Sequence, residues 1–315
     1  MPTLDVAYAL SSGRATLIDG LATAAAIRGE LREEVVRLTA GQGVRPGLGV
    51  VLVGDRPDSA TYVRMKRLAA REIGIGTVDV RLAKTATEAD VLRAVARLNG
   101  DASVHAILVQ LPLPAQIDEA NVLRAIRVDK DADGFSAANV GNMCLRGGTA
   151  PLALPCTPAG VVELLRRYEV PLAGAHVVVL GRSNIVGMPV SQMLQACDAT
   201  VTVCHSRTVD VAGFVRQADV LVAAIGLPGF VQADWLKPGC VVVDVGINAV
   251  DDATAPRGYR LVGDVEFEGA VLRASKITPV PGGVGPMTIA MLMRNTVNLA
   301  RHAAEQRRST ANATD

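Results

Sequence analysis

The sequence lacks an excess of charge of either sign. Its 315 residues include 32 Lys and Arg against 31 Asp and Glu, which gives a formal net charge of +1. A chain so balanced has no basic face for the phosphates of a nucleic acid, so we expect no nucleic-acid binding. It also lacks a long apolar run. No stretch reaches the roughly 18 residues that a membrane span requires, so we expect no membrane insertion.

Patterns typical of metal sites and disulfide frameworks are missing too. The five cysteines form no CxxC pair, and no two of the four histidines are spaced i, i+4, so we expect no metal site. A chain of this length does not depend on disulfides for its core, and we expect reduced thiols in a cytoplasmic protein. The first twenty residues have neither the basic start nor the apolar centre of a signal peptide. The cysteines are Cys144, Cys156, Cys197, Cys204 and Cys240.

The first half of the chain alternates between strand and helix patterns. LGVVLVG (48–54) is a continuous apolar run, typical of a strand buried on both faces. Asp19 is a candidate N-cap of a first helix, and Ser59 and Gly74 are candidates for the start and end of a second. Such alternation favours parallel βαβ units. The further segments are strands at 77–82 and 104–114 and a helix at 89–100.

The second half repeats this alternation after a loop. Gly and Pro residues predict that 129–158 is mostly loop, and Thr157 with Pro158 favours a helix start at its end. The length predicts two domains, residues 1–154 and 155–286, with a C-terminal helix 287–306 completing the first. The fold class is therefore α/β with two βαβ-type domains, the second a Rossmann-like doubly wound parallel sheet. Its predicted strands are 176–181, 200–204, 219–226 and 240–246.

The segment VVVLGRSNIVGMP (177–189) indicates a phosphate-binding turn. A buried strand runs into Gly181, and a helix begins near Gly187. This order places backbone N–H groups of a helix start at the carboxyl end of a parallel strand, where a pyrophosphate binds. The spacing meets the GxGxxG fingerprint only in part, so a tight turn without a ligand stays an alternative.

The next strand favours NADP over NAD. In NAD-binding folds it usually ends in Asp or Glu, which accepts a bond from the ribose 2′-hydroxyl. Here it ends TVTVCHSRT, with Ser206 and Arg207 in place of a carboxylate, while Arg182 lies in the phosphate turn. A 2′-phosphate requires donors and positive charge at this place. The alternative is that Arg207 is merely solvated.

The segment DKDADG (129–134) imitates the start of a calcium-binding EF-hand loop. The twelfth position of such a loop is Glu, but here it is Val140, so we exclude calcium binding. What remains is a carboxylate cluster in a Gly-rich loop. It either accepts bonds from a ligand's N–H groups or is a solvated turn. The carboxylates are Asp129, Asp131 and Asp133.

Tyr62 and Lys66 lie four residues apart and so share a face of the predicted helix. A phenol beside an amine suits proton transfer, although such pairs are also common on exposed helices. The chain has only five lysines, so its basic surface is mostly Arg. A desolvated Lys can lose its proton near neutral pH, whereas Arg cannot.

Taken together, these segments resemble one family. The chain is similar to the bifunctional methylenetetrahydrofolate dehydrogenase/methenyltetrahydrofolate cyclohydrolase family from about residue 18 to residue 300. The longest motifs, GRSNIVGMP and PGGVGPMT, are the most distinctive. The resemblance rests on YVRMK (62–66), VQLPLP (109–114), DKDADGF (129–135), PCTPAG (155–160), GRSNIVGMP (181–189), CHSRT (204–208), DVGIN (244–248), VGDV (262–265) and ITPVPGGVGPMT (277–288).

The resemblance implies roles for individual residues. It implies that Lys66 is the catalytic lysine, with Tyr62 and Gln110 as catalytic partners, and that Asp133 binds the pterin ring. Ser59 also matches a family serine, and Arg207 stands where many members have Lys. The remaining substrate-binding residues it implies are Val63, Val109, Leu111, Pro281, Gly282, Gly283, Val284 and Gly285. The cofactor-binding residues it implies are Gly181, Arg182, Ser183, Ile185, Ser206, Arg207 and Ile247.

The resemblance also implies the activity. It implies an enzyme that oxidises 5,10-methylenetetrahydrofolate to the methenyl form with NADP and then hydrolyses it to 10-formyltetrahydrofolate, in one-carbon metabolism and purine biosynthesis. Residues 1–154 would be the folate-binding catalytic domain and 155–286 the NADP domain, with the folate cleft between them, in a homodimer. Alternatives are another NADP oxidoreductase of the same fold, such as a shikimate-type dehydrogenase, and a catalytically silent dinucleotide sensor. A member with only one of the two activities is a third.

Overall fold

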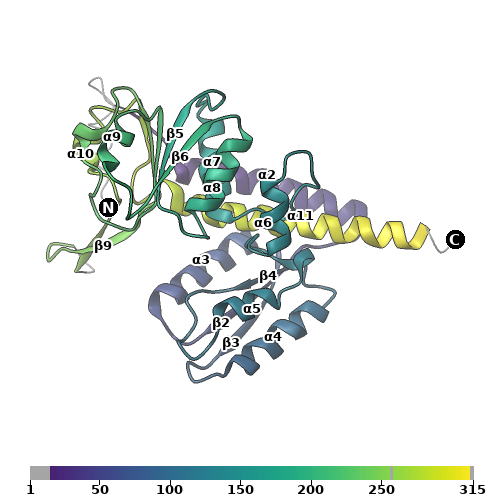
Figure 1. The fold of residues 1–315 in the computed structure, drawn as a ribbon. Helices are drawn as coiled ribbons and strands as arrows, with labels where there is room; N and C mark the ends of the chain where they lie inside the picture. Colours follow the sequence, from purple (N-terminus) through teal and green to yellow (C-terminus); the bar gives the residue numbers. More distant parts are fainter. Residues whose placement is uncertain (1–14, 256–257, 313–315) are drawn as a thin grey trace. The chain divides into compact units, whose positions relative to one another are not determined.

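The computed structural model describes residues 15–255 and 258–312 of the chain. These residues form two compact units, each with its own parallel sheet (Figure 1). The six-stranded unit contains residues 15–24 and 157–288, and the three-stranded unit contains 25–156 and 289–312. Helix α2 (Gly20–Gln42) crosses the division, as does α11 (Val284–Asn312). Each unit is therefore built from two separate stretches of sequence.

The sheet of the three-stranded unit is parallel, with the order β3-β2-β4. The central strand β2 (Gly47–Val53) is buried along its whole length, as its unbroken apolar pattern predicts. It pairs with β3 (Gly76–Leu82) from Gly47↔Gly76 to Val53↔Leu82. On its other side it pairs with β4 (Ala106–Val109), from Leu48↔Ala106 to Val51↔Val109. The carboxyl ends of all three strands thus lie at one edge.

Helices cover this sheet and supply its core. The amphipathic helix α4 (Glu88–Gly100) buries Val91, Val95 and Leu98 against β2 and β4. It begins with a capping box in which Thr87 and Asp90 satisfy each other's backbone N–H groups. The other helical segments of this unit are α3 (Pro57–Ile73), which precedes α4, and α5 (Glu119–Arg124), the 3-10 turn η1 (Val128–Lys130) and α6 (Ala137–Cys144), which follow it.

Two of the four predicted helix ends are confirmed. The Ala22 N–H donates to Asp19 Oδ1 at 2.9 Å, which caps α2, and Gly74 ends α3 with φ of 90°. The prediction that Ser59 is an N-cap is wrong, because α3 begins at Pro57 and Ser59 lies buried in its first turn. The Thr157 cap is wrong as well, since helix α7 (Cys156–Arg167) begins one residue earlier and Thr157 lies inside it.

The six-stranded sheet is also parallel, with the order β1-β11-β8-β7-β5-β6. Strand β5 lies between β6 and β7 and pairs with both. The strand order therefore reverses at β5. All four strands predicted for this unit are present, with ends that differ by up to three residues. They are β5 (His176–Leu180), β6 (Thr200–Cys204), β7 (Val220–Ala223) and β8 (Val241–Asp244).

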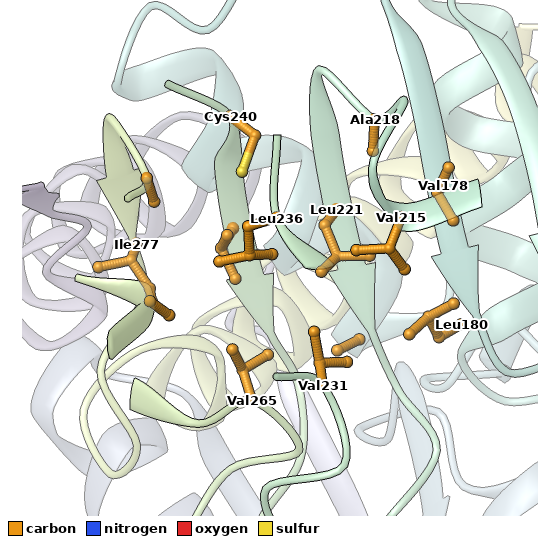
Figure 2. Close-up of a cluster of buried hydrophobic side chains, with 14 of the residues drawn as sticks. Val178, Leu180, Val215, Ala218, Leu221, Val231, Leu236, Cys240, Val265 and Ile277 are labelled. Atoms are coloured by element: carbon orange, nitrogen blue, oxygen red, sulfur yellow. The ribbon is translucent and has the colours of Figure 1, made fainter. Parts of the chain in front are cut away.

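Helices lie on both sides of this sheet, as in a doubly wound fold (Figure 1). Helices α7 and α8 (Gly187–Ala196) cover one face, and α9 (Val211–Val215) and α10 (Phe267–Ala270) cover the other. Figure 2 shows Leu221 and Val178 of the sheet packed with Val215 and Leu236 from the covering segments. The Rossmann-like doubly wound sheet predicted from the sequence is confirmed.

Several short elements have no counterpart among the sequence predictions. Strands β1 (Thr16–Leu17) and β11 (Lys276–Ile277) are too short to carry a periodic pattern and form because they extend an existing sheet. The hairpin of β9 (Asn248–Asp251) and β10 (Tyr259–Val262) is half exposed. Within the segment predicted as mostly loop, α6 forms behind a Ser136 N-cap. No helix within the described residues is long and apolar enough to cross a membrane.

Candidate active site

Lys66 lies on α3 and contacts the end of β4. Its Nζ donates a hydrogen bond to Gln110 Oε1 at 3.0 Å. Gln110 follows β4 directly, and its backbone N–H donates to the Val51 carbonyl at 2.9 Å. The side-chain Nε2 of Gln110 donates to the Leu111 carbonyl at 2.7 Å, which turns the amide oxygen toward Lys66. The end of β4 therefore places the Gln110 amide oxygen where it accepts a hydrogen bond from the Lys66 amine.

The environment of Lys66 makes its charged form less favourable than it is in water. Burial lowers the pKa of the Lys66 ammonium, and the negative charge of Asp133 opposes this effect in part. Tyr62 lies one turn earlier on the same face of α3 and is 42% exposed. By contrast, the side chains of Val63 and Val109 are buried in the core. A partly buried amine and an accessible phenol on one helix face are groups suited to general acid–base chemistry.

The three aspartates of DKDADG have different surroundings. Asp129 is paired with Arg127 at 2.6 Å on the surface. Asp131 is buried and organises the loop, because its carboxylate accepts the N–H groups of Gly134 at 3.0 Å and Ser136 at 2.7 Å. Asp133 is half-buried, and none of the described residues donates a hydrogen bond to its carboxylate. Of the three, only Asp133 keeps its oxygens available to a ligand.

Asp133 and Lys66 are close enough for each to change the other's protonation. Burial raises the pKa of Asp133 to about 6, with the nearby Asp131 adding to the rise and Lys66 opposing it. The Cys156 thiol shares this environment, and burial raises its pKa well above the ordinary value. An amine, a carboxylic group and an amide thus converge within the three-stranded unit.

One residue that supports this cluster was missed in the sequence. Asn295 of α11 donates from Nδ2 to the carbonyls of Ala132 at 2.9 Å and Leu154 at 2.8 Å. It is 5% exposed, and these two bonds tie α11 to the loop that carries Asp133. The only signal available in the sequence was a polar residue at an apolar position of the C-terminal helix pattern.

The phosphate turn of the six-stranded unit depends on two glycines. Gly181 has φ of 109°, and a Cβ there would lie 2.2 Å from the Ala224 carbonyl oxygen. A Cβ on Gly187 would lie 2.2 Å from the Gly181 carbonyl oxygen. Ser183 Oγ accepts the Gly187 N–H at 3.4 Å, and Arg182, Ser183 and Ile185 are all exposed. The turn leaves no room for a side chain at either glycine, and it presents the polar side chains of Arg182 and Ser183 to solvent before the start of α8.

The strand next to this turn ends without a carboxylate, as the sequence predicts. The Gly181 N–H donates to the Cys204 carbonyl at 2.8 Å, which ties the ends of β5 and β6 together. Ser206 and Arg207 are both exposed in the tight turn that follows β6. This arrangement fits a 2′-phosphate better than a free 2′-hydroxyl. Ile247, after β8, is 45% exposed.

The structure therefore divides the predicted residues into two groups. Tyr62, Lys66, Gln110 and Asp133 lie in the three-stranded unit, while the predicted cofactor residues lie in the six-stranded unit with the Pro281–Gly285 segment. In that segment the Gly283 N–H donates to the Pro279 carbonyl at 2.8 Å. Throughout 15–255 and 258–312, no three His, Cys, Asp or Glu side chains are grouped to hold a metal ion.

Comparison with known proteins identifies both domains. Residues 18–133 match the catalytic domain of tetrahydrofolate dehydrogenase/cyclohydrolase, and residues 155–304 match the NAD(P)-binding domain of the same enzymes. The chain belongs to the tetrahydrofolate dehydrogenase/cyclohydrolase family. The family's two activities, its folate substrates and the NADP cofactor, all expected from the sequence, are thereby confirmed.

Individual relatives are similar over nearly the whole chain. Bifunctional protein FolD 4, chloroplastic, of Arabidopsis thaliana is 54% identical over 92% of this chain and 81% of its own length. Bifunctional protein FolD of Geotalea uraniireducens is 52% identical over 91% of this chain and 99% of its own. The crystal structure of Trypanosoma brucei methylenetetrahydrofolate dehydrogenase-cyclohydrolase, complexed with NADP cofactor and inhibitor, is 47% identical. It covers 92% of this chain and 98% of its own, with a TM-score of 0.88.

Proposed function

We propose that this chain oxidises 5,10-methylenetetrahydrofolate to 5,10-methenyltetrahydrofolate with NADP and hydrolyses the product to 10-formyltetrahydrofolate at Lys66, Gln110 and Asp133. The observation that carries this assignment is the convergence of a half-buried lysine, an oriented amide and an available carboxylate in one unit. Family membership supports both activities.

Lys66 would manage the protons of the hydrolytic step. Water adds to the electrophilic methenyl carbon, and the neutral Lys66 amine accepts the proton that is released. The resulting ammonium returns this proton to N5 of the folate as the bond between N5 and the former methenyl carbon breaks. The remaining hydroxyl proton is released to solvent as that carbon becomes the formyl carbonyl on N10. Gln110 holds the Lys66 amine in place through the bond at 3.0 Å. Burial lowers the pKa of Lys66, which favours release of a proton from this side chain.

Asp133 would orient the substrate. An ionised carboxylate accepts two parallel N–H bonds, and the pterin ring of a folate presents adjacent N–H groups in that arrangement. The neighbouring Asp131 holds the loop through Gly134 and Ser136, which leaves the Asp133 oxygens for this purpose. Tyr62, exposed on the Lys66 face of α3, would contact the rest of the folate.

The residues present also fit an NADP molecule. When bound, NADP accepts the hydride from the methylene bridge of the folate. The close-packed turn at Gly181 and Gly187 admits a pyrophosphate against backbone N–H groups. Arg182, Ser206 and Arg207 would hold the 2′-phosphate, and Ile247 would lie beside the nicotinamide ribose.

One assay tests the whole proposal. Purified protein is mixed with methylenetetrahydrofolate and NADP, and absorbance is followed for the formation and decay of methenyltetrahydrofolate. We expect the methenyl signal to rise with NADP reduction and then to decay faster than its spontaneous hydrolysis. Formation without accelerated decay would assign the dehydrogenase step alone, and no formation would overturn the proposal.

Cofactor choice should depend on the side chains at the phosphate turn. Replacing Arg182 and Ser206 together by Ala should weaken NADP binding about tenfold or more, because a charge-assisted contact contributes roughly 1.5–3 kcal/mol. NAD binding should change far less, since NAD carries no 2′-phosphate. Titration of both dinucleotides against wild type and variant measures this. Equal losses for the two would show that these side chains do not recognise the 2′-phosphate.

Folate affinity should fall in acid. Because the pKa of Asp133 is raised to about 6, its carboxylate is ionised above that pH and protonated below it. Only the ionised form accepts two N–H bonds, so affinity should fall by up to about tenfold per pH unit below about pH 6. Binding of unreactive tetrahydrofolate between about pH 5 and pH 8 tests this. Asp133→Asn is the control, and a drop of the same size in that variant would contradict the assignment.

Homodimerisation, a cytoplasmic location and a place in purine biosynthesis belong to the same proposal. They rest on the resemblance alone. Sedimentation of the purified protein across a range of concentrations tests the dimer, and a single species of monomer mass would reject it.

A further inference from the structure

A fully buried carboxylate joins the loops that follow β7 and β8. Asp264, two residues after β10, is 0% exposed. Its Oδ2 accepts the N–H groups of Ile225 at 2.7 Å and Gly226 at 3.0 Å, just beyond β7. Its Oδ1 accepts a hydrogen bond at 2.9 Å from Nδ2 of Asn248, the first residue of β9, which closes the loop that follows β8. One side chain therefore holds two loops at the carboxyl edge of the sheet.

Asp264 is itself held rigidly. Its backbone N–H donates to Asp244 Oδ1 at 2.9 Å, and the Val265 N–H donates to Asp244 Oδ2 at 2.8 Å. Val265 is anchored in the apolar core beside Val231 (Figure 2). A Cβ on Gly246 would lie 2.3 Å from Asp264 Oδ1, so the β8 loop passes directly over the carboxylate. The position of Asp264 is determined by the core and not by solvent.

The two loops held by Asp264 face the dinucleotide edge. The loop after β7 packs against the phosphate turn, because the Ala224 carbonyl oxygen closes the space beside Gly181. The loop after β8 carries the exposed Ile247 next to Asn248. In a doubly wound sheet, a dinucleotide crosses the point where the strand order reverses, here between β5 and β7. With the 2′-phosphate at Ser206 after β6, the nicotinamide half would extend over the ends of β7 and β8.

We propose that Asp264 is a positioning residue for the nicotinamide half of NADP. It acts through its contacts with Ile225, Gly226 and Asn248. This inference rests on the proposed function, which places the adenosine end at Ser206. Asp264 touches neither substrate nor cofactor. It holds the loops on which the nicotinamide and its ribose lie, so that the reacting ring takes a single orientation.

The contact between Asp264 and Asn248 allows a reciprocal exchange. Asn248→Asp places a second carboxylate against that of Asp264 and removes the N–H donor, so the contact is lost. Adding Asp264→Asn restores a donor–acceptor pair, now with the amide on the other side. The Asn introduced at position 264 still offers one oxygen to the Ile225 and Gly226 N–H groups. The net charge of the double variant equals that of the wild type. A recovery of NADP binding in it would therefore be due to the restored contact between residues 248 and 264.

Two ligands separate positioning from folding. NADP contains the nicotinamide half, whereas adenosine 2′,5′-bisphosphate contains only the end placed at Ser206. We expect Asn248→Asp to weaken NADP binding and slow hydride transfer by about tenfold or more, with binding of the bisphosphate unchanged. The double variant should recover most of both losses. Hydrolysis of added methenyltetrahydrofolate, which needs no hydride transfer, should match the wild type throughout.

A matched control is Asp251→Asn, which removes a charge from an exposed position of the same hairpin and should change nothing. Parallel loss of NADP and bisphosphate binding in Asn248→Asp would show that Asp264 serves only to stabilise the fold. Failure of the double variant to recover would show that the contact does not position the nicotinamide. If the wild type binds NADP but not the bisphosphate, the placement of the adenosine end at Ser206 is wrong and this inference fails, whereas the proposed function fails only if methenyltetrahydrofolate is not formed.

Discussion

Replacing Lys66 by Arg is expected to nearly abolish hydrolysis of methenyltetrahydrofolate. Arg keeps the positive charge and about the same reach, but it cannot release its proton near neutral pH. The half-buried Lys66 amine, whose pKa is lowered by burial and which is held by Gln110, releases its proton far more readily than a guanidinium. General acid–base assistance contributes about 10²–10⁴-fold, which sets the expected loss. The hydride step depends mainly on the placement of two bound ligands, so it should survive in part.

The measurement is hydrolysis of added methenyltetrahydrofolate, after subtraction of its spontaneous hydrolysis. NADP affinity of the same variant serves as a folding control, because the cofactor residues belong to the other unit. Lys84→Arg makes the identical change at an exposed lysine outside the site and should behave like the wild type. Hydrolysis at the wild-type rate by the Lys66 variant would show that this residue supplies only charge, and another residue would have to manage the protons.

Replacing Asp133 by Ala is expected to raise the folate requirement by about 10²-fold or more while NADP affinity stays near that of the wild type. Two N–H bonds to an ionised carboxylate are lost, and each such bond contributes roughly 1.5–3 kcal/mol. No described residue donates a hydrogen bond to this carboxylate. Its removal should therefore lower the affinity for folate without breaking hydrogen bonds of the fold. The change also removes the negative charge that raises the pKa of Lys66, so that pKa should fall further.

The Asp133 prediction has a control within the same motif. Asp129→Ala removes a carboxylate that is paired with Arg127 on the surface, and it should leave folate affinity unchanged. Asp131→Ala should instead weaken the loop itself, because two backbone N–H groups lose their acceptor. The folate KM is measured at saturating NADP, and NADP affinity by titration without folate. A parallel fall in NADP affinity in Asp133→Ala would make Asp133 a structural residue.

The sequence alone was sufficient where neighbours along the chain decide the structure. The continuous apolar run at β2 and the four long strands of the six-stranded sheet are predicted because burial on both faces leaves an unbroken pattern. The Asp19 cap and the Gly74 end of α3 are also local, since each depends on backbone groups within a few residues. The missing carboxylate after β6 likewise follows from the residue types alone.

Only the tertiary structure decided how distant polar residues are used. Lys66 and Gln110 are 44 positions apart and meet because α3 and β4 pack on the same strand. The pattern DKDADG left three aspartates equivalent. In the folded structure Asp129 pairs with Arg127, Asp131 accepts hydrogen bonds from the loop backbone, and the Asp133 carboxylate accepts none from the described residues. The roles of Asn295 and Asp264 could not be predicted from local patterns, because a buried polar group is defined by its partners, and these come from remote segments. Local patterns determine which segments become strands and helices, but packing determines which side chains are left with an unsatisfied group to offer a ligand.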